Sequence, residues 1–205
     1  MCGRYHIDEK AFNEIIKIIR KVNEELGQQS GSDMVIQAKD MQAKDIHPTD
    51  FAPILGISDQ KLNCRWQRWG FPGFQGKQVI FNARSESALE KKTFRESVEN
   101  RRIVIPAAWF YEWNRKKEKN TFCRKDQPVL FMAGFYNRCQ DEERFVILTT
   151  EANESMRPVH DRMPLILGQD EILPWISDRG KTEDFLHKTP CLLERQAEFE
   201  QISLF

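Results

Sequence analysis

The chain has 205 residues, 40% of them hydrophobic and 30% charged, and its 31 basic and 31 acidic side chains leave a formal net charge of zero. This length fits one domain with a sizeable core, and the balanced charge excludes a global basic field, so any binding to nucleic acid has to rest on a local patch. No apolar run approaches the roughly 18 residues of a membrane span, and charged residues 8–10 lie where a signal peptide would begin.

The cysteines and histidines indicate a reduced protein without a metal site. The cysteines are odd in number and none is spaced as Cys-x-x-Cys, a pattern typical of reduced thiols in the cytoplasm. The histidines form no metal-ligand spacing with them. We therefore expect a cytoplasmic monomer with no metal, no cofactor and no membrane contact. The residues concerned are Cys2, Cys64, Cys123, Cys139, Cys191, His6, His47, His160 and His187.

The chain begins Met1-Cys2-Gly3-Arg4, and the thiol at position 2 is its first chemically distinctive group. Removal of Met1, which a small second residue favours, would leave Cys2 with a free α-amine and a thiol on one carbon frame. The amine of such a 1,2-aminothiol condenses with an aldehyde to a Schiff base, and the thiol then closes a five-membered thiazolidine. Both groups titrate close to neutral pH. The alternative is that position 2 accepts any small residue and that Cys2 is there by chance.

A strand and an amphipathic helix follow. Residues 3–7 alternate as a short strand does, and apolar side chains recur at helical spacing over residues 11–26, with Asp8 as the N-cap. The apolar stripe of this helix is expected to face the core. The polar stretch 28–44 predicts an exposed loop or insertion.

The middle of the chain predicts a series of strands around an aromatic segment. Two prolines exclude regular structure over residues 47–53. The segment 69–74, which holds Trp69 and Phe71, either forms a corner of the core or offers ring faces to bases, each stacked base contributing roughly 1–3 kcal/mol. The strands expected here are residues 54–57, 61–69, 79–81 and 102–106, with a turn at Ser58-Asp59 and a helix over residues 93–100.

Residues 109–113 place the carboxylate of Glu112 among four aromatic side chains. A carboxylate in such surroundings is costly unless it is hydrogen-bonded, and burial would raise its pKa. The alternative is that Glu112 lies on the solvent face of an alternating strand. Residues 114–125 carry six lysines and arginines against one glutamate, which predicts a hairpin tip that is either a solvated loop or a basic patch.

The last third predicts strands over residues 129–136, 144–150 and 165–167, and a short helix over residues 171–176. The loop 156–164 holds an imidazole, a carboxylate and two guanidiniums between prolines, a composition typical of catalytic loops. His160 in this loop is either a functional group or an ordinary surface histidine. No core-forming strand is expected after residue 182.

Four motifs occur in one order: Cys2-Gly3-Arg4-Tyr5, Asn82-Ala83-Arg84-Ser85-Glu86, Phe110-Tyr111-Glu112-Trp113 and His160-Asp161-Arg162-Met163-Pro164. Together they resemble the SOS-response-associated peptidase (SRAP) family, which forms covalent adducts with abasic sites in single-stranded DNA. The resemblance runs from residue 2 to about residue 167. The chain departs from the family at Asp50, where the family has Asn before x-Ala-Pro, and we expect no counterpart of the family's longer C-terminal segment.

The resemblance implies a role for each matching residue. Cys2 captures the aldehyde of an abasic site, Asn82 positions the N-terminal residue, and Glu112 transfers protons during imine formation. His160 protonates the ribose ring oxygen and helps to reverse the adduct. The expected DNA contacts are phosphate binding by Arg4, Arg84 and Arg162 and base stacking by Trp69, Phe71 and Trp109.

Two other functions fit the same residues. Cys2 beside a general base could cleave the Met1–Cys2 bond, which would make the protein a cysteine peptidase acting only on its own N-terminus. The chain could also be a non-catalytic module for single-stranded DNA in which Cys2 is incidental.

The last five residues, Gln201-Ile202-Ser203-Leu204-Phe205, resemble the short peptide that binds the bacterial sliding clamp. In such a peptide Leu204 and Phe205 would enter an apolar pocket while Gln201 anchors the other end. The alternative is that Leu204 and Phe205 complete the core of this protein itself.

The expected architecture is one α+β domain over residues 1–190, followed by a tail over residues 191–205. The number and length of the apolar runs indicate a mostly antiparallel sheet with helices packed outside it. The resemblance implies that this sheet is curled into a barrel-like shape.

Overall fold

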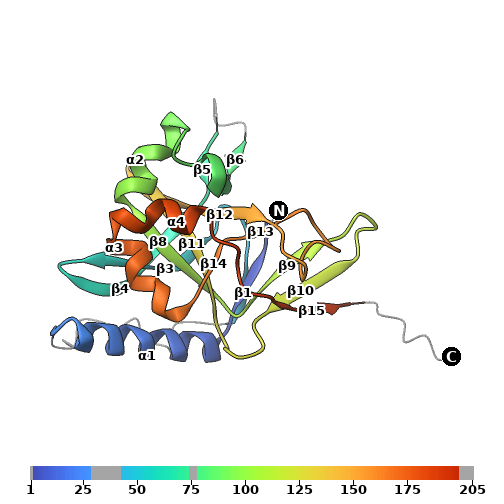
Figure 1. Ribbon diagram of the computed structural model, residues 1–205, viewed down its shortest axis with the longest axis horizontal. Helices are drawn as coiled ribbons and strands as arrows, with labels where there is room; N and C mark the ends of the chain where they lie inside the picture. Colours follow the sequence, from blue (N-terminus) through green and yellow to red (C-terminus); the bar gives the residue numbers. More distant parts are fainter. Residues whose placement is uncertain (1, 29–42, 74–77, 199–205) are drawn as a thin grey trace.

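The computed structural model describes residues 2–28, 43–73 and 78–198, and its centre is a closed β-barrel (Figure 1). The barrel strands are β3 (Phe51–Ser58), β4 (Lys61–Trp69), β8 (Arg102–Ala107), β11 (Leu130–Cys139) and β12 (Glu142–Glu151). They pair in the order β4, β3, β8, β11, β12, and β12 returns to β4 to close the ring. Within this ring only the pairing of β12 with β4 is parallel. The expected mostly antiparallel, barrel-like sheet in an α+β domain is confirmed.

Short strands extend the barrel around β12. The strand β7 (Asn82–Arg84) pairs in parallel with residues 147–149 of β12. The strand β13 (Arg162–Pro164) pairs antiparallel with residues 149–151 of the same strand. Thr149 of β12 is the partner of both Arg84 and Pro164. Two segments about 80 residues apart in the sequence therefore meet at one strand. The other short strands are β14 (Ile166–Leu167), paired with β11, and β5 (Phe71–Pro72), paired with β6 (Val79–Ile80).

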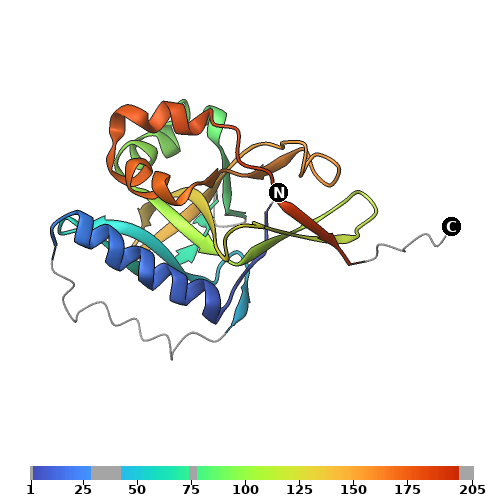
Figure 2. The same ribbon diagram turned by 60° about the horizontal axis from the view of Figure 1, so that its bottom comes forward.

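A second sheet has the strand order β15, β10, β9, β1, β2. Its strands are β1 (Tyr5–Ile7), β2 (Lys44–Ile46), β9 (Trp109–Trp113), β10 (Lys119–Cys123) and β15 (Glu194–Ala197). In Figures 1 and 2 the β9–β10 hairpin projects away from the barrel, and β15 runs along it. The sheet thus includes residues beyond position 190, where the tail was expected to begin.

The helix α1 (Glu9–Glu25) forms as its sequence predicts. Asp8 has an extended backbone, and its carboxylate accepts the N–H of Ala11 at 2.7 Å, which caps the first turn. The helix packs an apolar stripe against the barrel, and the chain leaves it through Gly27, whose φ of 68° lies in the left-handed region. The buried apolar residues are Ala11, Phe12, Ile15, Ile18 and Ile19.

Three more helices lie on the other side of the barrel from α1, at the left and upper left of Figure 1. They are α2 (Lys92–Asn100), α3 (Ile172–Ser177) and α4 (Thr182–Leu186). The buried guanidinium of Arg102 ties two of them together, because it donates to the carbonyl oxygens of Val98 in α2 and of Trp175 beneath it in α3. No described helix is long and apolar enough to cross a membrane.

Two sequence expectations were wrong in detail. Residues 51–53 are not irregular, since β3 begins at Phe51 and Pro53 pairs with Trp66. Pro53 lies outside the pairing of Leu55 with Val104 that joins β3 to β8, a position where a strand tolerates a residue without an N–H. The basic run 114–125 is a tip only as far as residue 118, because alternate residues of β10 are buried and extend the hairpin.

Candidate functional site

Cys2 and Glu112 lie beside each other because β1 pairs with β9. The pairing extends past β1 to Arg4, whose carbonyl oxygen accepts the N–H of Tyr111 at 3.0 Å. Because the two strands are antiparallel, the residues before β1 lie next to the last residues of β9, which include Glu112. Both side chains are buried, with 1% of Cys2 and 6% of Glu112 exposed.

The surroundings of Cys2 keep its thiol protonated. Burial raises the pKa of this thiol to about 12, and the charge of Glu112 adds to the shift. A weak bond from Sγ to the carbonyl oxygen of Arg4, over 3.9 Å, acts in the opposite direction. A reaction at this sulfur therefore needs a base that accepts its proton, and Glu112 is the carboxylate whose charge reaches it.

Asn82 fixes the backbone of Cys2 from a third element. It begins β7, where it is the partner of Ile147 in β12, and its Nδ2 donates to the carbonyl oxygen of Cys2 at 2.9 Å. Its Oδ1 is buried and accepts no hydrogen bond from the described residues. Three segments, each from a different part of the sequence, therefore converge at Cys2.

His160 lies across an open cleft that begins next to Glu112. The cleft has a volume of about 760 Å³, and its two walls are the tip of the β9–β10 hairpin and the loop before β13. The Nδ1 atom of His160 lies 2.8 Å from Oδ1 of Asp161, and the N–H of Arg162 donates to the same nitrogen at 2.9 Å. His160 is half-buried, so one side of its ring is accessible from the cleft.

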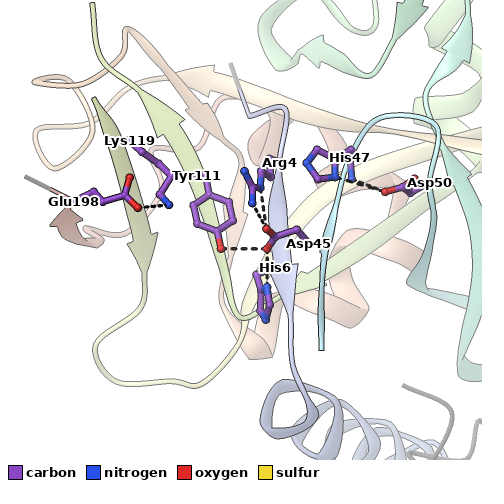
Figure 3. Close-up of polar contacts among 8 residues, drawn as sticks. All are labelled: Arg4, His6, Asp45, His47, Asp50, Tyr111, Lys119 and Glu198. Atoms are coloured by element: carbon purple, nitrogen blue, oxygen red, sulfur yellow. Dashed lines mark hydrogen bonds and ion pairs between the residues drawn. The ribbon is translucent and has the colours of Figure 1, made fainter. Parts of the chain in front are cut away.

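Arg4 is held by Asp45, the central residue of a polar network on β1 and β2 (Figure 3). Arg4 forms an ion pair with Asp45, with Nε 2.9 Å from Oδ2. His6 Nδ1 lies 2.7 Å from Oδ1 of Asp45, and the hydroxyl of Tyr111 donates to Oδ1 at 3.1 Å. Burial acts to raise the pKa of Asp45, but the bonds from Arg4, His6 and Tyr111 and the charge of Arg4 outweigh it and lower that pKa.

Trp109 is next to this network. Its ring stacks on the imidazole of His6, with centroids 4.1 Å apart and planes inclined by 3°. Trp109 is half-buried, and His6 covers one face of its ring.

The two arginines near β12 differ in their partners. Arg162 forms a bidentate pair with Glu86, at 2.6 and 2.9 Å, and donates to the carbonyl oxygen of Thr149 at 2.5 Å. Burial acts to raise the pKa of Glu86, but the hydrogen bond from Arg162 contributes most to lowering it. Arg84 is exposed, and within the described residues no carboxylate pairs with it.

Trp69 and Phe71 are core residues, so the expectation that they stack on bases is corrected. Trp69 is 0% exposed and Phe71 is 4% exposed. The Trp69 indole donates to the carbonyl oxygen of Phe81 at 2.9 Å and packs against Tyr5. Neither ring has a face open to a base, and the segment is the core corner that was its alternative reading.

The remaining predicted positions are placed as follows. Asp50 turns its carboxylate to its own loop, where it accepts the N–H of His47 at 2.9 Å. Gln201, Leu204 and Phe205 lie outside the described residues, as does most of the loop expected over 28–44. Among residues 2–28, 43–73 and 78–198, no three or more His, Cys, Asp or Glu side chains are grouped to hold a metal ion. All five cysteines are free thiols.

A family model described as SOS response associated peptidase (SRAP) matches residues 1–203. The chain belongs to the SRAP family. The abasic site processing protein YoqW of Bacillus subtilis is 30% identical over 206 residues, covering 91% of this chain and 84% of that protein. The abasic site processing protein YedK of Escherichia coli is 27% identical over 160 residues, covering 73% of this chain and 72% of that one.

The fold of this SRAP protein is also found in solved structures. A crystal structure of a protein from Bacteroides thetaiotaomicron has a TM-score of 0.73 and 24% sequence identity, covering 96% of this chain and 91% of that chain. One from Bordetella bronchiseptica has a TM-score of 0.71 and 23% identity, covering 96% and 99%.

Two features of this SRAP chain were not recognised from the sequence. Asp45 directly follows the stretch 28–44 that was assigned to a loop, and it was given no role, although Lys44, Asp45 and Ile46 alternate as a strand does. The loop that holds Arg157 was expected to carry functional groups, but its position on the wall opposite the hairpin was not, because that position depends on tertiary structure.

Proposed function

We propose that this protein captures abasic sites in single-stranded DNA through a covalent link to Cys2, after removal of Met1 exposes its α-amine. The supporting observation is that the buried Cys2 backbone is held by Asn82 while the charge of Glu112 acts on its thiol. Relatives such as YoqW and YedK carry the name abasic site processing protein. The open-chain form of an abasic deoxyribose is an aldehyde, which a 1,2-aminothiol captures.

The reaction has two bond-forming steps. The α-amine of Cys2 adds to the aldehyde carbon, and loss of one water gives an imine. The sulfur then adds to the imine carbon, and the thiol proton ends on nitrogen, which completes a thiazolidine without any oxidant or reductant. Because the thiol is protonated at neutral pH, Glu112 takes its proton and returns it to nitrogen.

Asn82 and His160 act at the two ends of this reaction. The amide of Asn82 keeps the carbonyl of Cys2 in place, and its buried Oδ1 is an acceptor for the new α-amine. His160, at the cleft, donates a proton to the ribose ring oxygen to open the sugar, and by microscopic reversibility it assists release of the adduct.

The three arginines differ in how much each must rearrange before it can bind a phosphate. Arg84 is exposed and can meet a phosphate directly. Arg4 and Arg162 must first exchange Asp45 and Glu86 for a phosphate, so they contribute less to affinity than their charge suggests. Trp109 offers the ring face that His6 leaves uncovered.

The test is a denaturing gel after incubation with single-stranded DNA that carries one abasic site. Wild-type protein whose intact mass confirms loss of Met1 should give a DNA band retarded by covalent protein. Cys2→Ala should give no such band, while Cys191→Ala, the matched control at an exposed cysteine, should retain it. No retarded band from processed wild-type protein would overturn the proposal.

Autoprocessing is a second candidate, supported by the nearness of the Cys2 thiol to a carboxylate. In this reaction the sulfur attacks the carbonyl carbon of Met1, and Glu112 takes the thiol proton and passes it to the nitrogen of Cys2 as the Met1–Cys2 amide bond breaks. Water then hydrolyses the thioester, which releases methionine and restores the thiol of Cys2. Intact mass spectrometry of Glu112→Gln should then show retained Met1. Equal loss of Met1 from wild type and Glu112→Gln would mean that another enzyme removes it.

We also propose that residues 201–205 bind a sliding clamp, which rests on their sequence alone. A pull-down on immobilised clamp should retain the wild type and release the Leu204→Ala/Phe205→Ala double variant. Equal retention of both proteins would remove the idea.

A further inference from the structure

The loop that carries His160 is closed at its base and packed inside. The N–H of Ala152 donates to the carbonyl oxygen of Asp161 at 2.9 Å, which joins the residue after β12 to the residue before β13. Within the loop, the carbonyl oxygen of Met156 accepts the N–H of His160 at 3.1 Å. Met156 and Val159 are buried. These contacts hold the loop together, so its place relative to the β9–β10 hairpin depends on contacts with other segments.

Asn153 ties this loop to the segment that leads into β15. Its Nδ2 donates to the carbonyl oxygens of Pro190 at 3.1 Å and of Cys191 at 2.9 Å. Its Oδ1 accepts the N–H and the hydroxyl of Ser155, at 3.0 and 2.6 Å. The Oγ atom of Ser155 in turn accepts the N–H of Leu193 at 3.1 Å. Two bonds from Asn153 and one to Ser155 therefore join the loop to that segment.

The same segment is fixed to the hairpin on the other wall of the cleft. The strand β15 begins at Glu194 and pairs with β10 along its whole length, with Glu194 opposite Cys123. Leu193, whose N–H is bound by the loop, is 7% exposed and belongs to the hydrophobic core. The attachments to the loop and to the hairpin thus lie on adjacent residues. The segment transmits the position of the hairpin directly to the loop.

The amide of Asn153 is suited to this connection and not only to a turn. The side chain is 8% exposed, and its two N–H donors and its oxygen are all engaged. A turn of this kind needs only an acceptor, which aspartate supplies as well as asparagine does. The two donors of Asn153 serve only the bonds to Pro190 and Cys191.

We propose that Asn153 is a positioning residue that holds the imidazole of His160 at a fixed distance from Glu112. The connection runs through residues 190–193 and β15. This inference rests on the proposed function, in which His160 protonates the ribose ring oxygen. A general acid acts only within hydrogen-bond reach of its acceptor, so a displacement of about 1 Å removes much of its effect. Asn153 acts through the loop and not by contact with the reacting atoms.

Asn153→Asp tests the connection, because it keeps the acceptor for Ser155 and removes both donors. Two single-stranded DNA substrates are compared on denaturing gels. One carries an abasic site, whose sugar must be opened, and the other an open-chain aldehyde made by periodate cleavage of a diol. Asn153→Asp should slow adduct formation at the abasic site roughly tenfold to hundredfold and leave the rate with the open-chain aldehyde unchanged. Equal slowing with both substrates would overturn the proposal.

The matched control is Asn63→Asp, near the turn between β3 and β4. The Nδ2 atom of Asn63 also donates twice, to the hydroxyl of Ser58 at 2.6 Å and to the carbonyl oxygen of Lys61 at 3.2 Å. This variant loses the same two donors far along the chain from the loop, and both rates should stay at the wild-type value. Slowing at the abasic site as large as that of Asn153→Asp would contradict a specific role of Asn153.

A double-mutant cycle shows whether Asn153 acts through the imidazole. His160→Gln should slow the reaction at the abasic site, and Asn153→Asp should add little in that background. A full additional loss in the double variant would mean that Asn153 acts on another group.

Ser155→Ala keeps the test decisive if Asn153→Asp fails to fold. It leaves the amide of Asn153 in place and removes the acceptor of the Leu193 N–H. The reaction at the abasic site should slow by a smaller factor than in Asn153→Asp, and the reaction with the open-chain aldehyde should not slow. Loss of both rates together would count against the proposal.

Hydrogen exchange tests the connection without the capture reaction. In Asn153→Asp, exchange should rise together in residues 191–193 and in the loop 152–161, by at least about tenfold, while β11 keeps its wild-type rate. Faster exchange in only one of the two segments would show that they are not connected through Asn153. Absence of any adduct with wild-type protein would count against the capture reaction, and the exchange data would still decide whether the loop is held by this segment.

Discussion

The two sides of Glu112 are built in opposite ways. On one side, the first residues of the chain are packed and paired: Cys2 is buried, and Arg4 is bound to Asp45. On the other side, the cleft is open, and the cations of its hairpin tip have no carboxylate partner among the described residues.

Under the proposed function, this difference separates the part of the protein that holds the reacting group from the part that holds the substrate. A nucleophile gains from fixed geometry, because it then has little rearrangement left when the aldehyde arrives. A site for a flexible strand gains from unpaired cations, because a charge already neutralised by the protein has to give up that partner first. Four predictions test this contrast, from the largest expected effect to the smallest.

The largest effect concerns the two thiols Cys2 and Cys191. With a pKa of about 12, Cys2 has a thiolate fraction near neutral pH that is roughly a thousandfold below that of an ordinary thiol. Iodoacetamide should therefore label the exposed Cys191 at least about a hundredfold faster, as measured by peptide mass spectrometry. Glu112→Gln removes a charge that raises the Cys2 pKa, so it should speed labelling of Cys2, whereas Glu118→Gln on the hairpin tip should not. Comparable labelling of both thiols in wild type would show that the Cys2 thiol is accessible and not held protonated by its surroundings.

The pair of Arg162 and Glu86 gives the next largest effect. Arg162→Ala should lower the free energy of unfolding by about 2 kcal/mol, because it leaves Glu86 and the carbonyl of Thr149 without their donor. Urea denaturation measures the change. Adding Glu86→Ala should recover part of the loss, and a double variant no more stable than Arg162→Ala would mean that the two residues are not coupled.

Asp45→Asn should cost about 1 kcal/mol near pH 7, since it weakens the bonds from Arg4 and His6. The pKa of Asp45 is lowered in the folded protein, so its contribution to stability is complete above the unfolded value of about 4 and is lost as the pH falls through the folded value. Urea denaturation between about pH 3 and about pH 7 should show the difference from wild type shrinking only at the acid end. The exposed Asp141→Asn serves as control, and an equal loss there would contradict a specific network.

The smallest effect is that of Arg84→Ala. Because Arg84 is exposed and within the described residues has no carboxylate partner, its removal should leave the urea midpoint unchanged. Affinity for single-stranded DNA should fall about threefold and the salt slope by about 0.7, measured by anisotropy. A drop in stability without a change in affinity would mean that Arg84 has a structural role, as Arg4 and Arg162 do, and does not bind DNA.

Local patterns in the sequence were sufficient for much of the fold. Asp8 followed by a helical apolar stripe predicted α1 and its cap, and alternation predicted most barrel strands within a residue or two. Closure of the barrel depends on Phe145 of β12 pairing with Trp69 of β4, and no local pattern specifies a contact between strands so far apart. The barrel itself was expected only through the family resemblance.

The candidate site was harder to predict, for two physical reasons. A Trp-Gly-Phe segment has the same composition in a core corner as on a stacking surface, and only burial distinguishes them, as it did for Trp69. The positioning role of Asn82 was expected only through the family resemblance, because its hydrogen bond to Cys2 is made to a backbone carbonyl oxygen, which every residue has. Residue identities indicated chemistry at Cys2 and Glu112, but their partners required the structure.

The pairing of β15 with β10 also determines where the end of the chain is tethered. Lys119, next to the hairpin tip, forms an ion pair with Glu198 at 2.6 Å, and its carbonyl accepts the N–H of that residue at 3.1 Å. Seven residues follow Glu198, and a chain of that length reaches at most about 25 Å. A partner bound to those residues would be tethered within that distance of the cleft. Its effective concentration at the cleft would then depend on the length of the tether and not on its concentration in solution.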